Sequence, residues 1–106
     1  MIIKERQVKL GIPTDDGKTV SGIFGRANSF AVYDTDTAEL IVLANEGIGA
    51  EHGAGTGAAS FLAEQGVSKV LAPELGPKAL SALSSAGVAV ARVEAGTKIL
   101  EVVRRA

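Results

Sequence analysis

The sequence has no cysteine and no tryptophan, and aromatic residues make up only 4% of its 106 positions. The absence of cysteine excludes disulfides and leaves no thiolate to hold an iron–sulfur cluster or a zinc ion. The shortage of aromatics predicts a core of aliphatic residues. It also removes the stacking platforms on which single-stranded nucleic acids bind.

An excess of charge of one sign is lacking too, because the formal net charge is −1 and the only adjacent basic pair is Arg104 and Arg105. Nucleic-acid binding normally requires clustered Lys and Arg, so we expect none. No apolar run approaches the ~18 residues of a membrane span, and the first residues do not resemble a secretory leader. We therefore expect a cytoplasmic protein that binds no membrane.

What is present is the composition of a folded protein, with 46% hydrophobic and 22% charged residues. The length suits a single domain over residues 1–106. Hydrophobic patterns predict strands at 8–13, 29–34, 39–45, 69–72 and 88–93, and helices at 56–65, 77–86 and 97–105. Pro13 is expected to end the first strand.

The predicted order of elements is β-β-β-α-β-α-β-α. A polar turn at 35–38 joins two strands into an antiparallel hairpin, whereas the alternation in the second half indicates parallel strands. We therefore predict a three-layer α/β fold with a mixed five-stranded sheet. The nearly continuous apolar run at 39–45 predicts that this strand is buried on both faces.

The segment 51–66 reads Glu-His-Gly-Ala-Gly-Thr-Gly-Ala-Ala-Ser-Phe-Leu-Ala-Glu-Gln-Gly. Gly53, Gly55 and Gly57 permit tight bends, and the helix formers after them predict a helix from Thr56. Free N–H groups at a helix start attract anions. Because His52, the only histidine, directly precedes these glycines, we predict that one wall of a site lies here.

Several stretches together resemble one known family. Residues 11–30 read Gly-Ile-Pro-Thr-Asp-Asp-Gly-Lys-Thr-Val-Ser-Gly-Ile-Phe-Gly-Arg-Ala-Asn-Ser-Phe, and Gly-Ala-Gly-Thr-Gly-Ala-Ala begins at Gly53. Later come Gly-Val-Ser-Lys-Val-Leu, Gly-Pro-Lys-Ala-Leu-Ser-Ala-Leu and Ala-Gly-Val-Ala-Val. In order and spacing, from about residue 8 to the end, they resemble the dinitrogenase iron–molybdenum cofactor biosynthesis family.

This resemblance implies a ribonuclease H-like fold and a role related to nitrogen fixation. It implies a non-enzymatic protein that binds or carries an iron–sulfur or iron–molybdenum cluster, or a precursor, as a metallocluster carrier. Many relatives have a histidine where this chain has Ile23. Isoleucine cannot ligate a metal. With no cysteine and no histidine at position 23, the sequence therefore lacks the protein ligands that a cluster usually has.

The predicted site lies between the loops 19–28 and 46–57. His52 is its coordinating or hydrogen-bonding group and a metal-ligand candidate, Arg26 pairs with an anion, and the amides from Gly55 to Gly57 form a cradle. Each residue also has a simpler interpretation. The histidine could bond to nearby backbone, the arginine could be solvated, and the glycines could serve close packing.

There are three alternative functions to a carrier, and only the first uses the same loops. A phosphate- or nucleotide-binding regulatory module would use the glycine run, since Gly53, Gly55 and Ala58 formally meet the dinucleotide fingerprint, although residues 46–52 separate them from the preceding strand. A protein partner would be favoured if Ile23 and Phe24 were exposed together. A nuclease would need a carboxylate within the first strand, which has none, so the Asp pair at 15–16 is better explained as turn chemistry.

Overall fold

The computed structural model describes residues 8–48 and 53–106. The elements follow the predicted order: β1 (Lys9–Thr14), β2 (Ser29–Asp34), β3 (Glu39–Ala44), α1 (Ala54–Glu64), β4 (Lys69–Ala72), α2 (Pro77–Ser85), β5 (Ala89–Arg92) and α3 (Ile99–Arg105). None of these helices is long and apolar enough to cross a membrane.

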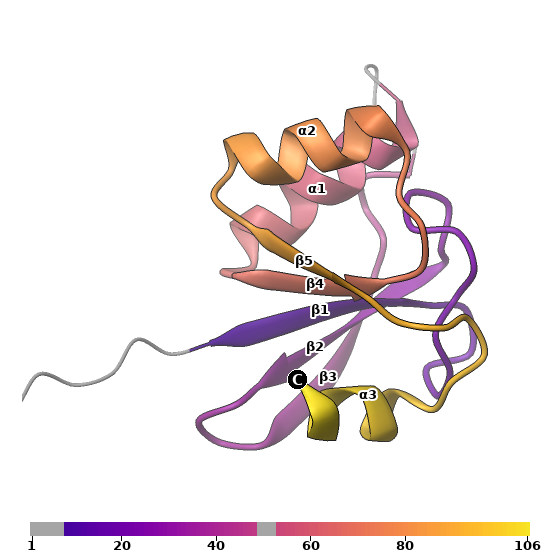
Figure 1. The fold of residues 1–106 in the computed structure, drawn as a ribbon, viewed down its shortest axis with the longest axis vertical. Helices are drawn as coiled ribbons and strands as arrows, with labels where there is room; N and C mark the ends of the chain where they lie inside the picture. The colour runs from indigo at the N-terminus through magenta and orange to yellow at the C-terminus, as the bar shows by residue number, and fades with distance from the viewer. Residues whose placement is uncertain (1–7, 49–52) are drawn as a thin grey trace, which may run out of the picture.

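The five strands form one mixed sheet in the order β3-β2-β1-β4-β5. The pairs β1–β2 and β2–β3 are antiparallel, whereas β1–β4 and β4–β5 are parallel. Figure 1 shows α1 and α2 together on one face of the sheet and α3 on the other. This is the three-layer arrangement with a mixed five-stranded sheet that the sequence pattern predicts, and it agrees with the ribonuclease H-like fold that the family resemblance implies.

Each face of the sheet has its own apolar core. Phe30 and Leu62 are fully buried between the sheet and the α1–α2 layer, where the rings of Phe24 and Phe30 lie 5.3 Å apart. Ile12 and Ile99 are buried in the second core under α3. As predicted, the cores are mainly aliphatic, and burial of these side chains is the main force that holds the layers together.

Pro13 does not end β1, contrary to the sequence prediction, because the strand continues to Thr14 and Pro13 pairs with Phe30 of β2. A proline lacks the N–H that a ladder needs, so it is tolerated only where no partner requires that donor. On the other side of β1, the parallel ladder with β4 covers only Leu10 and Gly11. It ends before the proline.

The prediction that the third strand is buried on both faces is wrong. Among residues 8–48 and 53–106, β3 pairs only with β2 and forms an edge of the sheet, and Ile41 and Val42 are 44% and 48% exposed. Leu40 and Leu43 are partly buried, each against a different core. The apolar run therefore reflects a strand with one free backbone edge, which apolar content alone does not distinguish from a central strand.

Candidate functional site

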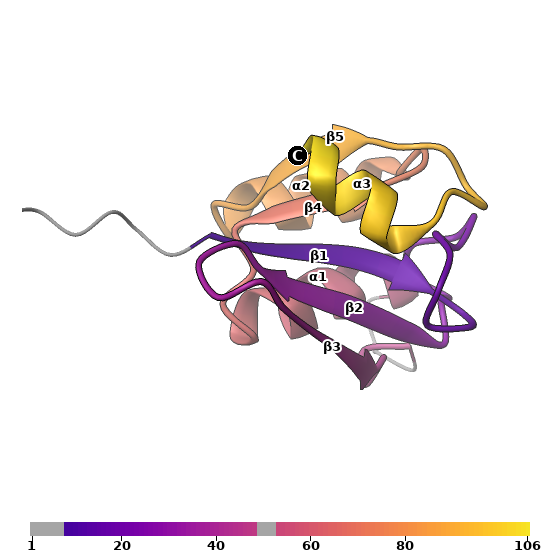
Figure 2. The same cartoon turned by 90° about the horizontal axis from the view of Figure 1, so that it is seen from below.

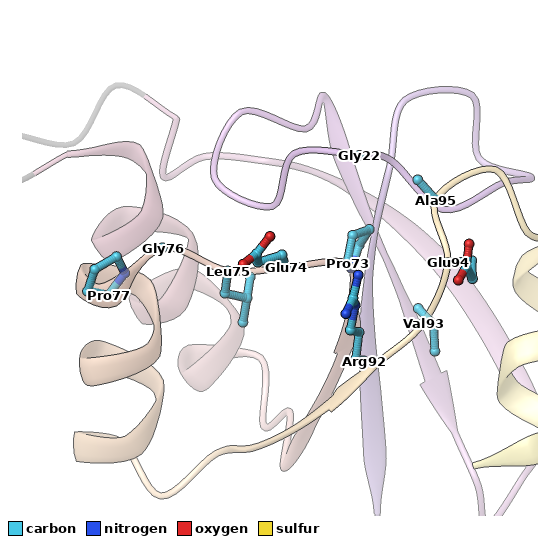
Figure 3. Close-up of a pocket in the computed structure, with 10 residues that line it drawn as sticks. All are labelled: Gly22, Pro73, Glu74, Leu75, Gly76, Pro77, Arg92, Val93, Glu94 and Ala95. Atoms are coloured by element: carbon cyan, nitrogen blue, oxygen red, sulfur yellow. The ribbon is translucent and has the colours of Figure 1, made fainter.

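A groove runs along the carboxyl ends of β1, β4 and β5. It consists of two adjoining cavities of about 640 and 600 Å³, which share Gly22 and the segment 74–77. Figure 3 shows the second cavity between the loop that carries Gly22, the chain after β4 and the chain after β5. In α/β sheets, ligands commonly bind at this edge, because loops from several strands meet there.

The start of α1 forms one end of the groove. Ala54 and Gly55 line the larger cavity, and the N-cap, Gly53, has φ 102° and offers no side-chain hydrogen bond. In the described part of the chain, the first N–H groups of this helix therefore have no side-chain cap. The helix begins at Ala54, two residues earlier than predicted, so Gly55 and Gly57 are helical residues and do not form a loop.

The start of α2 faces the same cavity. Its N-cap, Gly76, makes no side-chain hydrogen bond, and Pro77 occupies the first turn, where its missing N–H costs nothing. Lys78 and Ala79, in the first turn of the helix, also line the cavity. Two uncapped helix N-termini thus meet in one groove, and each brings partial positive charge to it.

The charged side chains along the groove come from three different segments. Arg26 and Lys78 line the larger cavity, Arg92 and Glu94 line the other, and Glu74 lines both. All five are exposed. Within residues 8–48 and 53–106, none of the three basic groups forms an ion pair, so their charge remains available to a ligand.

A close approach between the 19–28 loop and α1 shapes the larger cavity. A Cβ added at Gly25 would lie 2.6 Å from the backbone nitrogen of Gly55. Only glycine allows this contact without displacing the helix start. The buried Asn45 fixes the loop by donating from Nδ2 to the carbonyls of Gly25 and Ala27, at 3.1 and 3.0 Å, while its Oδ1 accepts from the N–H of Gly47.

The two aspartates before this loop have structural roles. Asp15 accepts hydrogen bonds from the hydroxyl of Ser21 and the N–H of Asn28. Asp16 accepts from the N–H groups of Thr19 and Lys18, and these bonds lower its pKa to about 2. This is the turn chemistry expected from the sequence, and it occupies the carboxylates that a nuclease would need for metal ions.

The structure brings some of the predicted site residues together. Arg26 and Gly55 line the same cavity, as the predicted meeting of the two loops requires. Gly53 is exposed at the helix start but does not line this cavity. Gly57 lines a separate cavity, and its N–H donates to the Gly53 carbonyl at 3.0 Å, so the predicted cradle is wrong at this amide. His52 lies outside the described residues.

The structure also bears on the protein-partner and dinucleotide-binding alternatives. Phe24 is buried and only Ile23 is exposed, so the two do not form the shared apolar surface that would favour a protein partner. Ile23, whose side chain cannot ligate a metal, lines the larger cavity. The structure does not support a dinucleotide site, because α1 follows the antiparallel edge strand β3 and Gly55 lies within the helix, not in a loop after a parallel strand.

The start of α2 and the end of β5, which contribute Lys78 and Arg92, line the groove but were not predicted from the sequence. A signal for the helix start was present. Gly76 and Pro77 start a helix directly after a parallel strand, so that helix start must lie at the carboxyl edge of the sheet, beside the first strand's loop.

The fold and this groove define a small α/β protein with a ligand-type groove at the carboxyl edge of a mixed sheet. The chain belongs to the dinitrogenase iron–molybdenum cofactor family, whose model matches residues 6–106. The matched region includes every segment that lines the groove.

Similar proteins support this assignment. An uncharacterised protein of Methanocaldococcus jannaschii is 30% identical over 92 residues, which cover 84% of this chain and 77% of that protein. The apo form of the orange protein from Desulfovibrio gigas has a TM-score of 0.85 at 30% identity, over 96% of this chain and 88% of that one. A Thermotoga protein provisionally assigned as NifB, of the DUF35 family, has a TM-score of 0.75 at 32% identity, with 92% and 84% covered.

The groove's chemistry can be compared with the cargo that the family name indicates. The described residues contain no group of three or more His, Cys, Asp or Glu that could hold a metal ion. The groove instead offers N–H groups and basic side chains, which bind anions. These groups fit a cluster that carries its own sulfide ligands and a net negative charge better than they fit a bare metal ion.

Proposed function

We propose that this protein is a non-enzymatic carrier that binds an anionic iron–sulfur or iron–molybdenum cluster, or a precursor of one, in the groove at the carboxyl edge of its sheet. The observation that carries the proposal is the convergence of two uncapped helix starts with Arg26 and Lys78 around one cavity of about 640 Å³. Family membership supports the nature of the cargo.

Binding without metal–protein bonds follows from the residue types. With no cysteine in the sequence and Ile23 at the cavity, the groove supplies charge and hydrogen bonds to the outside of a cluster. Such contacts are individually modest, since a hydrogen bond to a charged group contributes about 1.5–3 kcal/mol and exposure to salt weakens it. Weak, separable contacts suit a protein that must release its cargo.

A binding role also agrees with the positions of the titratable groups. Glu74 and Glu94 lie exposed on the rim, and no buried acid or base points into the groove among the described residues. Catalytic acids and bases are usually activated by burial and by close charged neighbours. Glu94 lines only the cavity that contains Arg92, whereas Glu74 lines both, so a negatively charged ligand is favoured in the larger cavity beside Arg26 and Lys78.

The test is an anaerobic equilibrium titration with a preformed, thiolate-capped four-iron four-sulfur dianion, followed by visible absorbance. We expect saturable binding, weakened about threefold to tenfold by Arg26→Gln or Lys78→Gln and weakened further by added salt. The matched control is Arg104→Gln on α3, which removes the same charge far from the groove and should leave affinity unchanged.

Inorganic phosphate, titrated into the same protein, tests the alternative of a phosphate- or nucleotide-binding module. Tight phosphate binding together with no cluster binding would favour that alternative. If the groove variants and the Arg104→Gln control weaken cluster binding equally, the interaction is a general charge effect and the groove is not the site.

A further inference from the structure

The strand β3 is an exposed apolar edge on a small protein. Its six residues, Glu39–Ala44, carry one charge and no proline, and Figure 2 shows β3 as the outermost strand on its side of the sheet. Natural sheets usually protect such edges with lysine, proline, a bulge or a covering segment. The opposite edge, β5, is shorter and ends in Arg92, so the two edges differ in protection.

The side chains of β3 are apolar on both faces. Leu43 packs against the core under α1 and α2, and Leu40 packs against the core under α3. Because side chains alternate along a strand, Ile41 shares the first face and Val42 the second. Both are about half exposed, at 44% and 48%, so a strand added at this edge would bury apolar surface on both sides of the sheet.

The backbone pattern fixes which groups are free at this edge. Asn45 donates its N–H to the carbonyl of Asn28 at 3.0 Å, in the register that continues the β2–β3 pairing. Hydrogen-bonded pairs alternate in an antiparallel ladder. The backbone groups of Ile41 and Leu43 therefore point toward β2, and those of Leu40, Val42 and Ala44 point outward.

We propose that β3 pairs with β3 of a second copy of this chain, antiparallel and with Val42 on the two-fold axis, to form a continuous ten-stranded sheet. In this register Val42 exchanges hydrogen bonds with Val42 of the other copy, and Leu40 does so with Ala44. Leu43 lies opposite Ile41, and Glu39, the only charged residue of β3, falls at the end of the pairing, opposite the position of Asn45.

The symmetric apolar pattern of β3 favours a second copy of this chain as the pairing partner. The strand is apolar in both directions from Val42, so an antiparallel copy meets apolar side chains with apolar side chains at every inner position. Moving the axis to Ile41 would place the Glu39 carboxylate opposite Leu43. The contact is small, so we expect a dimer that forms at micromolar concentrations or above.

Sedimentation velocity over micromolar to millimolar concentrations tests the pairing. Val42→Lys should weaken association about tenfold or more, because two like charges would lie directly opposite each other. Val42→Glu should do the same, and an equimolar mixture of the two variants should recover dimer as a mixed pair. The control Leu80→Lys changes a similarly apolar and exposed residue on α2, the helix that packs against α1 and β5, and should leave association unchanged.

Hydrogen exchange of the unaltered protein gives a second measurement that needs no variant. Protection of the amides of Leu40, Val42 and Ala44 should rise with protein concentration, while that of Ile41 and Leu43 should stay constant. A protein that remains monomeric throughout the range overturns the proposal. So does a dimer in which these three amides gain no protection, or a mixture of variants that fails to associate.

Discussion

The close approach of Gly25 to the start of α1 makes a sharp prediction for Gly25→Ala. An added Cβ would lie 2.6 Å from the backbone nitrogen of Gly55 and 2.8 Å from the carbonyl carbon of Ala54. Ordinary van der Waals contact begins near 3.4 Å, so the overlap is about 0.8 Å. Both obstructing atoms belong to the helix backbone, and no side-chain rotation relieves the contact.

The cost follows from the rigidity of both partners. Overpacking of this kind typically costs about 1–3 kcal/mol, while replacing glycine by alanine returns about 0.4–1 kcal/mol by restricting the unfolded chain. We place the net loss in unfolding free energy at about 1–2 kcal/mol. For a domain of this size that lowers Tm by about 4–16 °C.

Urea unfolding followed by circular dichroism measures this change. The control is Gly22→Ala, in the same loop and on the same groove, where the added Cβ would lie 3.9 Å from the Cβ of Ala95 in ordinary contact. It should stay within about 0.5 kcal/mol of the wild type. If Gly25→Ala also stays within that margin, the loop can leave α1 freely, and the packing argument for the groove is refuted.

Two further predictions concern the same loop. Asn45→Ala leaves the carbonyls of Gly25 and Ala27 and the N–H of Gly47 without their partner, so urea unfolding should show a loss of about 2–4 kcal/mol; a loss below about 0.5 kcal/mol would mean that water replaces the amide. Asp16 has its pKa lowered to about 2, so it stabilises the folded state fully above its ordinary value of 3.8, and this contribution disappears as the pH falls toward 2. The free energy of unfolding, measured from pH 5 down to about pH 2, should therefore depend less steeply on pH for Asp16→Asn than for the wild type. Identical slopes would show that the hydrogen bonds from Thr19 and Lys18 do not lower the pKa of Asp16 in the folded state.

The sequence predicts the order of elements well because hydrophobic periodicity and turn residues act locally. Ser29–Asp34 and Lys69–Ala72 are found with the predicted bounds. Burial is different, because it depends on what lies beside an element. β3 has an apolar run typical of a central strand, yet topology places it at an edge, and only pairing information reveals this.

The site could be predicted only in part, because some of its residues have local sequence signals and others reach the groove through the topology of the sheet. Arg26 and Gly55 come from segments with strong local signals, and both line the larger cavity. Lys78 and Arg92 have no distinctive local context and reach the groove through the parallel β1–β4–β5 arrangement. The glycine run was expected to bend the chain into a loop. Instead Gly55 lets α1 approach α2, since its added Cβ would lie 3.1 Å from the Cβ of Ala79.

The central claim is that an anionic cluster binds between the two uncapped helix starts. Amide NMR spectra during titration with the thiolate-capped iron–sulfur dianion test this most directly. We expect the N–H signals of Gly55, Lys78 and Ala79 to shift or broaden first and to saturate together, while those of Arg104 and Arg105 on α3 do not change. Shifts that are spread over both faces of the sheet, or confined to α3, would contradict the account.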